Sequence, residues 1–281
     1  MKKFDYFKPN SLKEASQMLI QNEENTHILN GGTDLIVRIN EEIICPDVVV
    51  DIKGIKELYE IKYDEVKGLT IGACVTMNDL DWNEIVREKF KIVSDSAHMV
   101  GSSQIRNRAT MIGNICNASP LADTATCLYA LDAVVLIYGP NGEREVSIHD
   151  FILSVRKTCL KPGEIVTAIR IPEYKEKVFA PYQKLSRRKE VDLSTVCASV
   201  IKVDGEIRIA LGSVAPTPVR ARKTEDFLKG KDLSDEVIYK AGAIASTEVS
   251  PIDDVRGSKE YRLEMVDILV RRGLRELKGD K

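Results

Sequence analysis

The sequence has few of the residues from which protein metal centres are built. Its 281 residues include only three histidines and six cysteines, and the closest cysteines, Cys116 and Cys127, are eleven residues apart. Because CxxC spacing is absent, we expect no zinc or iron–sulfur ligands in this chain. Widely scattered thiols are also typical of proteins from a reducing compartment.

Long apolar runs and an excess of either charge are missing as well. The longest apolar stretch, residues 131–138, contains Asp132, so no segment approaches the roughly 20 apolar residues that span a bilayer. Asp5 stands where a signal peptide would need its apolar core. A formal net charge of −2 gives no electrostatic reason to expect a nucleic-acid partner. We therefore expect a cytoplasmic protein that binds neither membrane nor nucleic acid.

The periodicity of the first fifty or so residues predicts a small unit of helices and strands. Ser11 is a good helix N-cap, Glu14 stands in the capping-box position, and the apolar pattern continues to Ile20. Two short strands, 27–29 and 47–52, enclose a glycine pair and the helix-like run 35–39.

Beyond residue 60 the pattern predicts a sheet with helices between its strands. We expect strands at 69–72, 133–138, 144–148 and 164–171, and helices at 83–89, 91–100 and 123–131. A hairpin turn is predicted at 139–142, where Asn-Gly supplies positive φ angles. After a boundary between Pro172 and Pro181, we expect a hairpin of strands 195–203 and 206–214, followed by helices at 235–248 and 258–277.

Two segments carry candidate chemistry. In the first, a strand runs into Gly31-Gly32-Thr33-Asp34, where bare backbone N–H groups and the Thr33 hydroxyl can surround phosphate oxygens. The alternative is a strand-to-helix turn in which glycine merely supplies positive φ. Neither GxGxxG nor a Walker A loop occurs in the chain, so a Rossmann dinucleotide site is disfavoured.

The second segment is the stretch 104–123. Small and amide-bearing residues dominate it, which predicts a long irregular loop, and such loops usually have a function or their own packing. Thr110, Asn114, Ser119 and Asp123 offer donors and acceptors to phosphates and sugar hydroxyls. The alternative is an ordered structural loop.

Taken together, the motifs resemble one family along essentially the whole chain. They are GGTDL at 31–35, QIRN-x-x-T-x-x-GNI-x-x-x-SP-x-x-D at 104–123, Asp150-Phe151, T-x-L-x-x-x-E-I at 158–165, SRR at 186–188 with Asp192-Leu193, ALGSVAPTP at 210–218 and RGSKEYR at 256–262. This order is similar to that in the FAD-binding subunits of molybdenum hydroxylases such as xanthine, carbon monoxide and nicotinate dehydrogenases.

The resemblance implies an α+β fold. A two-part FAD-binding domain of the vanillyl-alcohol-oxidase/PCMH type would span 1–175, with subdomains at about 1–55 and 56–175. An α+β domain of the CO dehydrogenase flavoprotein type, an antiparallel sheet with helices, would span 176–281.

The resemblance also implies which residues hold FAD. The first loop would surround the pyrophosphate with His27, Ile28, Leu29, Asn30, Gly31, Gly32, Thr33, Asp34 and Leu35. The second would approach from the other side with Thr110, Met111, Ile112, Gly113 and Asn114. Asp123 would hold ribose or ribityl hydroxyls, whereas Val100, Ile165 and Lys184 would line the isoalloxazine. The charge of Lys184 would favour the reduced, anionic ring; otherwise Lys184 is an exposed lysine on a strand.

One position departs from the family pattern. The family has two glycines before the asparagine, and this chain has Ile112-Gly113, with Met111 and Ala109 also less usual. We expect the branched side chain of Ile112 to crowd a backbone that lies against the cofactor, which would bend the loop or weaken FAD binding.

The implied role is electron transfer, with no catalytic nucleophile or general base in this chain. FAD would take electrons from [2Fe–2S] clusters of a small subunit, which receives them from a molybdopterin large subunit, and pass them to NAD⁺ or another acceptor. The complex could be a dimer of heterotrimers, with purines such as xanthine the leading substrates. The alternatives are a self-sufficient FAD oxidoreductase of the same fold and an assembly subunit that has lost FAD.

Overall fold

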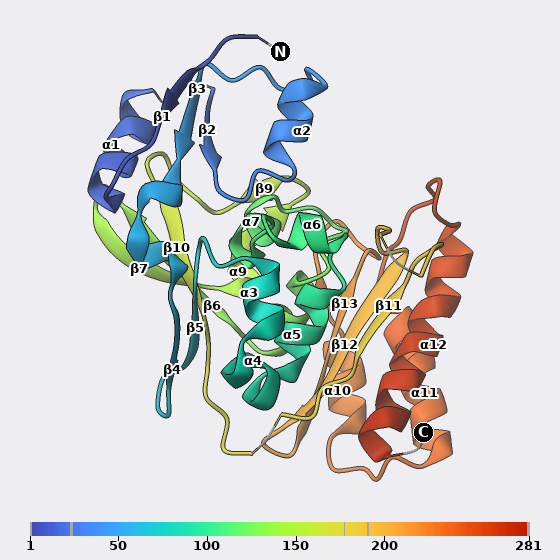
Figure 1. The fold of residues 1–281 in the computed structure, drawn as a ribbon. Coiled ribbons are helices and arrows are strands. Elements are labelled where there is room, and N and C mark those ends of the chain that lie inside the picture. Colours follow the sequence, from blue (N-terminus) through green and yellow to red (C-terminus); the bar gives the residue numbers. More distant parts are fainter. Residues whose placement is uncertain (1, 23–24, 177, 190, 280–281) are drawn as a thin grey trace.

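The computed structural model describes residues 2–22, 25–176, 178–189 and 191–279, and its first fifty residues form a small parallel sheet with two helices (Figure 1). The sheet has the order β1-β3-β2. Its elements are β1 (Asp5–Phe7), α1 (Leu12–Gln21), β2 (Thr26–Leu29), α2 (Leu35–Asn40) and β3 (Val48–Asp51). The Ser11 cap of α1 is confirmed, but the Glu14 carboxylate accepts from the N–H of Asn10 rather than from that of Ser11.

A five-stranded antiparallel sheet of order β4-β5-β10-β6-β7 forms the centre of the molecule. Its strands are β4 (Ile61–Asp64), β5 (Gly68–Gly72), β6 (Val134–Gly139), β7 (Gly142–Ser147) and β10 (Ile165–Ile171). The β6–β7 hairpin is confirmed, although only Gly142 has a positive φ in its turn. Asn141 does not, because Pro140 fixes a negative φ and selects another turn type.

Short helices and a small hairpin accompany this sheet. They are η1 (Ile52–Gly54), η2 (Lys56–Tyr59), α3 (Met77–Trp82), α4 (Glu84–Lys89), α5 (Lys91–His98), α6 (Ser103–Arg106), α7 (Met111–Cys116), α8 (Ala125–Ala130), α9 (Ile148–Phe151), β8 (Ile152–Ser154) and β9 (Lys157–Thr158). The predicted irregular loop 104–123 therefore contains most of α6 and all of α7. Ser102 and Thr110 cap these helices through their side chains, which offsets weak helix propensity.

The C-terminal part is a four-stranded antiparallel sheet with three helices. Its elements are β11 (Tyr182–Leu185), β12 (Val196–Val203), β13 (Glu206–Gly212), β14 (Val219–Arg220), α10 (Arg222–Leu228), α11 (Asp235–Ser246) and α12 (Lys259–Lys278). Both predicted long helices and the β12–β13 hairpin are confirmed. Its turn residues, Asp204 and Gly205, both have positive φ angles, as two-residue hairpins of this twist prefer.

The C-terminal sheet is buried on both faces, which explains why β12 is apolar at almost every position. Helices α11 and α12 cover one face, and Gly273 of α12 lies so near the sheet that an added Cβ would stand 2.6 Å from Val200. Helix α8 covers the other face, where Ile201, Val203 and Ala210 join the main core. The two parts of the molecule are thus continuous in packing, while the division at residue 175 stays a prediction.

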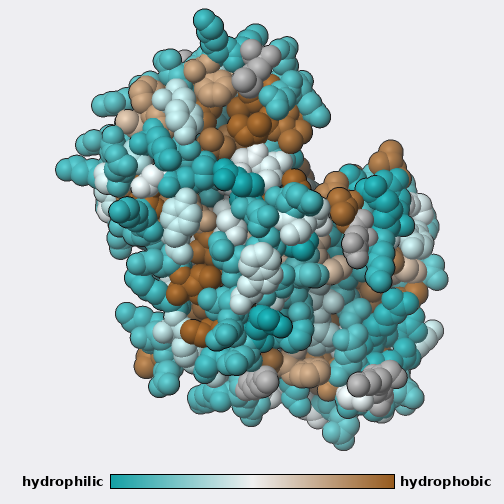
Figure 2. All heavy atoms as spheres, viewed as in Figure 1, coloured by the Kyte–Doolittle hydropathy of each residue, from teal (hydrophilic) through white to brown (hydrophobic). Residues whose placement is uncertain are grey.

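A hollow separates the two parts at one end (Figure 2). The elements around α2 form one side, and the C-terminal part forms the other (Figure 1). No helix in the described part of the chain has the length and apolar character needed to cross a membrane.

Candidate functional site

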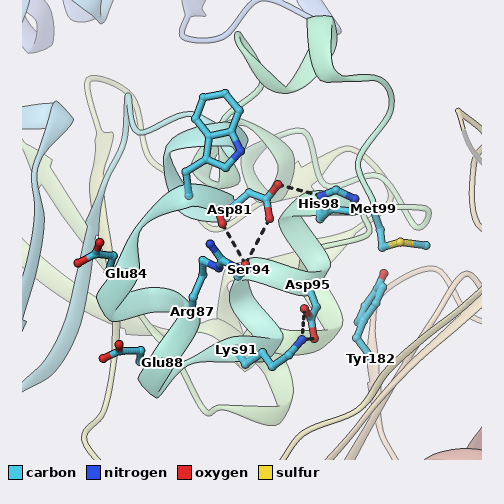
Figure 3. A pocket seen from close by; sticks show the side chains of 11 residues that line it. Asp81, Glu84, Arg87, Glu88, Lys91, Ser94, Asp95, His98, Met99 and Tyr182 are labelled. Atoms are coloured by element: carbon cyan, nitrogen blue, oxygen red, sulfur yellow. Dashed lines mark hydrogen bonds and ion pairs between the residues drawn. The ribbon is translucent and has the colours of Figure 1, made fainter.

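A groove of about 830 Å³ lies on the surface of α3, α4 and α5 (Figure 3). Charges of both signs line it, including Asp81, which pairs with His98 at 2.8 Å, and exposed Lys91. Among the residues that the structure describes, no three His, Cys, Asp or Glu side chains are grouped to hold a metal ion. The groove contains none of the predicted site residues. It borders the site only through Met99 and Tyr182.

The first predicted loop begins where β2 ends, and Asn30 fixes its position. The side-chain N–H of Asn30 donates to the carbonyl of Ala73 (2.6 Å), and the backbone carbonyl of Asn30 accepts from Lys53 Nζ (3.0 Å). Lys53 is itself held at 2.7 Å by the buried Asp51 at the end of β3. Asn30 Oδ1, in contrast, is buried without a hydrogen-bond partner among the described residues.

The glycine pair brings this loop against the second one. An added Cβ on Gly31 would lie 2.2 Å from the carbonyl oxygen of Arg108, so only glycine permits this approach. Gly32 has a φ of +82°, and its carbonyl accepts from the N–H of Ile36 (3.0 Å) at the start of α2. Within the described residues, the N–H groups of Gly32, Thr33 and Asp34 donate to no other group. They remain available to an anionic ligand.

The remaining residues of the first segment are half-buried. His27, Ile28 and Leu29 lie on β2, whereas Leu35 opens α2. Burial, with the nearby charge of Arg38 as a smaller cause, lowers the pKa of His27. The ring of His27 is therefore neutral at neutral pH.

The second predicted loop is organised by Thr110 and Asn114. The Thr110 hydroxyl accepts from the N–H of Gly113 (2.9 Å), and Asn114 Oδ1 accepts from the hydroxyl of Thr124 (2.7 Å). An added Cβ on Gly113 would meet only the Thr110 hydroxyl within 4 Å. The backbone at Gly113 is thus otherwise open, on a short helix that the sequence pattern alone did not predict.

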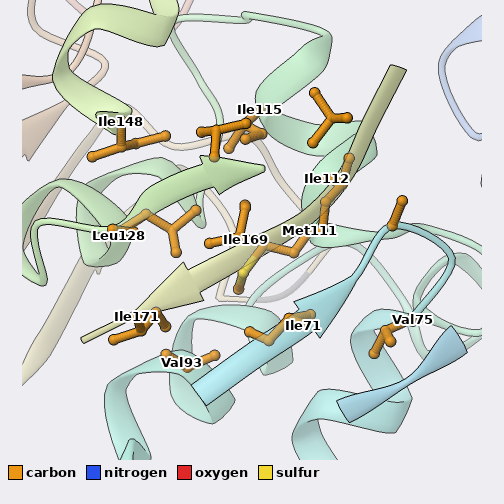
Figure 4. Packing of buried hydrophobic residues seen from close by; sticks show 14 of the residues in the cluster. Ile71, Val75, Val93, Met111, Ile112, Ile115, Leu128, Ile148, Ile169 and Ile171 are labelled. Atoms are coloured by element: carbon orange, nitrogen blue, oxygen red, sulfur yellow. The ribbon is translucent and has the colours of Figure 1, made fainter. Parts of the chain in front are cut away.

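The expected crowding by Ile112 is wrong. Ile112 is 2% exposed, and with Met111 it packs into the main core beside Ile169 of β10 (Figure 4). Because residues 111–116 form a helix, the side chain at 112 points inward while the backbone at 113 stays open. The residue that departs from the family pattern is a core residue in this chain.

Two other predicted residues also lie at or in the core. Ile165 opens β10 and is 1% exposed, so its side chain belongs to the main core. Val100 is partly buried against the same core, and its carbonyl accepts from Arg106 (3.3 Å).

Lys184 and Asp123 form a buried ion pair that joins the two parts of the chain. Lys184 lies on β11, and its Nζ is 2.9 Å from both Asp123 Oδ2 and the carbonyl oxygen of Met99. The two side chains are 4% and 7% exposed, so the alternative of an exposed lysine is wrong. The Ser194 hydroxyl donates to the other oxygen of Asp123. Burial raises the pKa of Asp123, while Lys184 and Ser194 act in the opposite direction.

Residues of the C-terminal motifs hold the segments that contain this pair and Ser194 in place. Buried Arg262 donates to the carbonyls of Thr195 (2.6 Å) and Ser213 (2.8 Å) and pairs with Asp254 (2.6 Å). The N–H of Ser213 in turn donates to the carbonyl of Pro120 (3.0 Å), just before Asp123. The RGSKEYR and ALGSVAPTP motifs therefore hold Ser194 and the loop containing Asp123 together.

Sequence reasoning missed Arg156, which connects the two predicted loops. Its guanidinium donates to Asp34 (2.9 and 3.3 Å) in the first loop and to Asn117, directly after α7, in the second. Nothing in the sequence near Arg156 indicated this contact, because Asp34 lies 122 residues away along the chain.

Comparisons with known proteins cover both parts of the chain. Residues 2–174 match the family described as the FAD binding domain in molybdopterin dehydrogenase, and residues 181–277 match the CO dehydrogenase flavoprotein C-terminal domain. The glyceraldehyde dehydrogenase medium chain of Sulfolobus acidocaldarius is 32% identical, with 98% of each chain covered. The xanthine dehydrogenase FAD-binding subunit of Escherichia coli is 31% identical, with 96% of this chain and 94% of that one covered.

Solved structures confirm the predicted fold class. A chain of carbon monoxide dehydrogenase from Hydrogenophaga pseudoflava superimposes with a TM-score of 0.94 at 31% identity, covering 99% of this chain and 98% of that one. A chain of quinoline 2-oxidoreductase from Pseudomonas putida gives a TM-score of 0.92 at 27% identity, covering 100% and 99%.

Proposed function

This chain belongs to the FAD-binding medium subunits of molybdenum hydroxylases, and from that membership we propose that it binds FAD between its two loops and passes electrons through it. The family membership makes the chain a subunit of an oxidoreductase. The observation that carries the site proposal is the contact between the loops at Gly31 and Arg108, beside a row of free N–H groups.

The residues present fit the cofactor. The N–H groups of Gly32, Thr33 and Asp34 suit diphosphate oxygens, because successive free backbone N–H groups form an anion-binding concavity. Buried Asn30 Oδ1 lacks a donor, and a hydroxyl or amine of the ligand would supply one. The open backbone at Gly113 leaves room on the other side. Asp123 and Lys184 would then mark the flavin end, where the two form a buried ion pair.

When bound, FAD accepts electrons singly and releases them as a pair. We propose that the electrons come from [2Fe–2S] clusters of a small subunit, that a molybdopterin large subunit supplies them, and that NAD⁺ is the acceptor. The residues of this chain bind and orient the cofactor and provide no nucleophile or general base. We propose that the complex is a dimer of heterotrimers. We place it in the cytoplasm, because all six cysteines are free thiols, which suits a reducing compartment.

The substrate of the complex is not encoded in this subunit. The relatives named for glyceraldehyde, carbon monoxide and xanthine are 32%, 32% and 31% identical to this chain. Sequence identity is therefore nearly the same for relatives named for different substrates, and it does not distinguish among these substrates. Xanthine and other N-heterocycles remain our leading hypothesis. Turnover of candidate substrates by the complete complex, purified through this subunit, would decide it.

Thr33 offers a direct test of FAD binding. Its hydroxyl has no partner among the described residues, so Thr33→Val should leave the stability of the free chain unchanged. If the hydroxyl donates to the diphosphate, the dissociation constant for FAD should rise by roughly tenfold to a hundredfold, because hydrogen bonds to charged groups contribute about 1.5–3 kcal/mol.

The matched control is Thr70→Val, on the open face of the five-stranded sheet. Its dissociation constant should equal that of the unchanged chain in titrations followed by flavin fluorescence. A purified chain that retains no flavin absorbance after FAD is added and unbound FAD is removed would refute the proposed function and favour an assembly subunit. Oxidation of a small organic substrate by the flavin-loaded chain alone would favour a self-sufficient enzyme.

A further inference from the structure

The backbone of Arg156 has an unfavourable conformation for a residue other than glycine. It occupies the second turn residue of the β8–β9 hairpin, because Ser154 pairs with Lys157. Its φ is +59°, a region that this turn position normally fills with glycine or asparagine. Such outliers persist where surrounding contacts hold them, and they cluster at functional sites.

The contacts that hold Arg156 lead to both loops of the proposed FAD site. Its N–H donates to the carbonyl of Ala118 (2.9 Å), which itself has a φ of +47° and follows α7. Its guanidinium binds both carboxylate oxygens of Asp34 (2.9 and 3.3 Å) and the amide oxygen of Asn117. One residue from a third segment therefore fixes the spacing of loops that are far apart in the sequence.

Charge gives this contact a second consequence. Asp34 follows directly after Gly32 and Thr33, so its carboxylate lies on the loop whose free N–H groups would receive the diphosphate. An unpaired carboxylate there would repel the ligand. The bidentate contact with Arg156 neutralises it.

We propose that Arg156 is a positioning residue for the cofactor, which holds the loops 31–35 and 110–117 at binding distance and neutralises Asp34. The inference rests on the proposed function. Since the Arg156 and Asp34 side chains are 41% and 40% exposed, their pair contributes little to folding. Its effect should therefore appear in FAD binding through preorganisation of the loops.

Arg156→Gly separates the effect of this residue on folding from its effect on FAD binding. Glycine accepts the positive φ, so the variant should unfold at the same temperature as the unchanged chain or slightly higher. Its dissociation constant for FAD should rise about tenfold, which corresponds to about 1.4 kcal/mol. Arg156→Lys keeps the charge but not the bidentate contact, and its dissociation constant should be intermediate.

Asp34→Asn and the double variant with Arg156→Gly complete the test. The double variant should bind FAD no more weakly than Arg156→Gly alone, because the two residues act through one contact. Arg170→Gln is the control, since Arg170 makes a similar contact with Glu145 on the open sheet face. Its affinity for FAD should be unchanged.

The outcomes separate this inference from the proposed function. An unchanged chain that binds FAD tightly, together with an Arg156→Gly variant whose affinity is within twofold of it, refutes the positioning role alone. Additive losses in the double variant refute it as well. An unchanged chain that binds no FAD refutes the proposed function and the inference with it.

Discussion

Replacing Lys184 by methionine tests whether the Lys184–Asp123 pair is as buried as its geometry indicates. Methionine retains an apolar chain of similar volume, so the cavity contribution is small. The variant loses both Nζ contacts of 2.9 Å and leaves the Asp123 carboxylate with Ser194 as its remaining side-chain partner. Removing one member of a buried pair costs about 3–5 kcal/mol. We therefore expect the free energy of unfolding to fall by about 4 kcal/mol at neutral pH.

The pH dependence of this loss has a definite sign. Burial already raises the pKa of Asp123 above its ordinary value of 3.8, and removal of Lys184 takes away a charge that opposes the rise. In the variant, the folded state therefore binds a proton more readily than the unfolded state, and its stability falls as the pH rises through 3.8 and above. The difference from the unchanged chain should be smaller in weakly acidic buffer than at neutral pH.

Urea unfolding at both pH values measures these quantities. Asp123→Asn combined with Lys184→Met leaves no uncompensated charge, so the double variant should be more stable than Lys184→Met alone. Lys91→Met is the matched control, because Lys91 is 69% exposed in its pair with Asp95 and should cost less than about 1 kcal/mol. A loss below about 1 kcal/mol for Lys184→Met, or a loss independent of pH, would refute the reasoning.

Two further predictions concern the burial of Ile112 and the ion pairs that Asp132 makes with Arg208 (2.9 Å) and Arg220 (2.6 Å) of the C-terminal sheet. Ile112→Gly, which restores the family residue, should lower the free energy of unfolding by about 3–5 kcal/mol without tightening FAD binding, because Ile112 is 2% exposed in the core. Denaturant unfolding and FAD titration would check both parts, and tighter binding would contradict the placement of Ile112. Asp132→Asn should cost about 2 kcal/mol at neutral pH, discounted for the 37% exposure of Asp132. Burial alone would raise the pKa of Asp132, but His149, Arg220 and Arg208 lower it below its ordinary value of 3.8. The stability that Asp132 contributes is therefore present above pH 3.8 and is lost as the pH falls through the pKa of the folded state. A difference between Asp132→Asn and the unchanged chain that persists at the same size in strong acid would argue against these contacts.

Features set by neighbouring residues were predicted well from the sequence. Helix α12 was expected at 258–277 and spans Lys259–Lys278, where Ser258 caps its start and Gly279, at a φ of +89°, ends it. The Asp204-Gly205 hairpin was predicted for the same reason, because its turn residues determine their own φ angles. Helix α3 was missed, although Thr76 and Asp79 form a complete capping box at its start. That signal was present in the sequence.

Features set by distant contacts were predicted less well. Residues 104–123 have low helix propensity, and α7 forms there because Thr110 caps it and because Met111, Ile112 and Ile115 pack into the core. The family resemblance brought the candidate residues of this segment into the argument. It led to the wrong direction for Ile112, because the helical turn that directs the side chain inward was not part of the prediction.

Lys184 shows why a burial pattern alone does not identify the important residues of this site. On β11 it follows Gln183, and a lysine in such a strand normally points to solvent. Its neutralising partner comes from a different segment, at Asp123, and the two meet only because α8 packs on the C-terminal sheet. Arg156 and Asp34 are likewise paired across 122 residues. Both pairs place charge between segments that the proposed cofactor would also join, so FAD affinity should depend on both. The buried Lys184–Asp123 pair also connects the two parts of the chain, whereas the exposed Arg156–Asp34 pair lies within the first part.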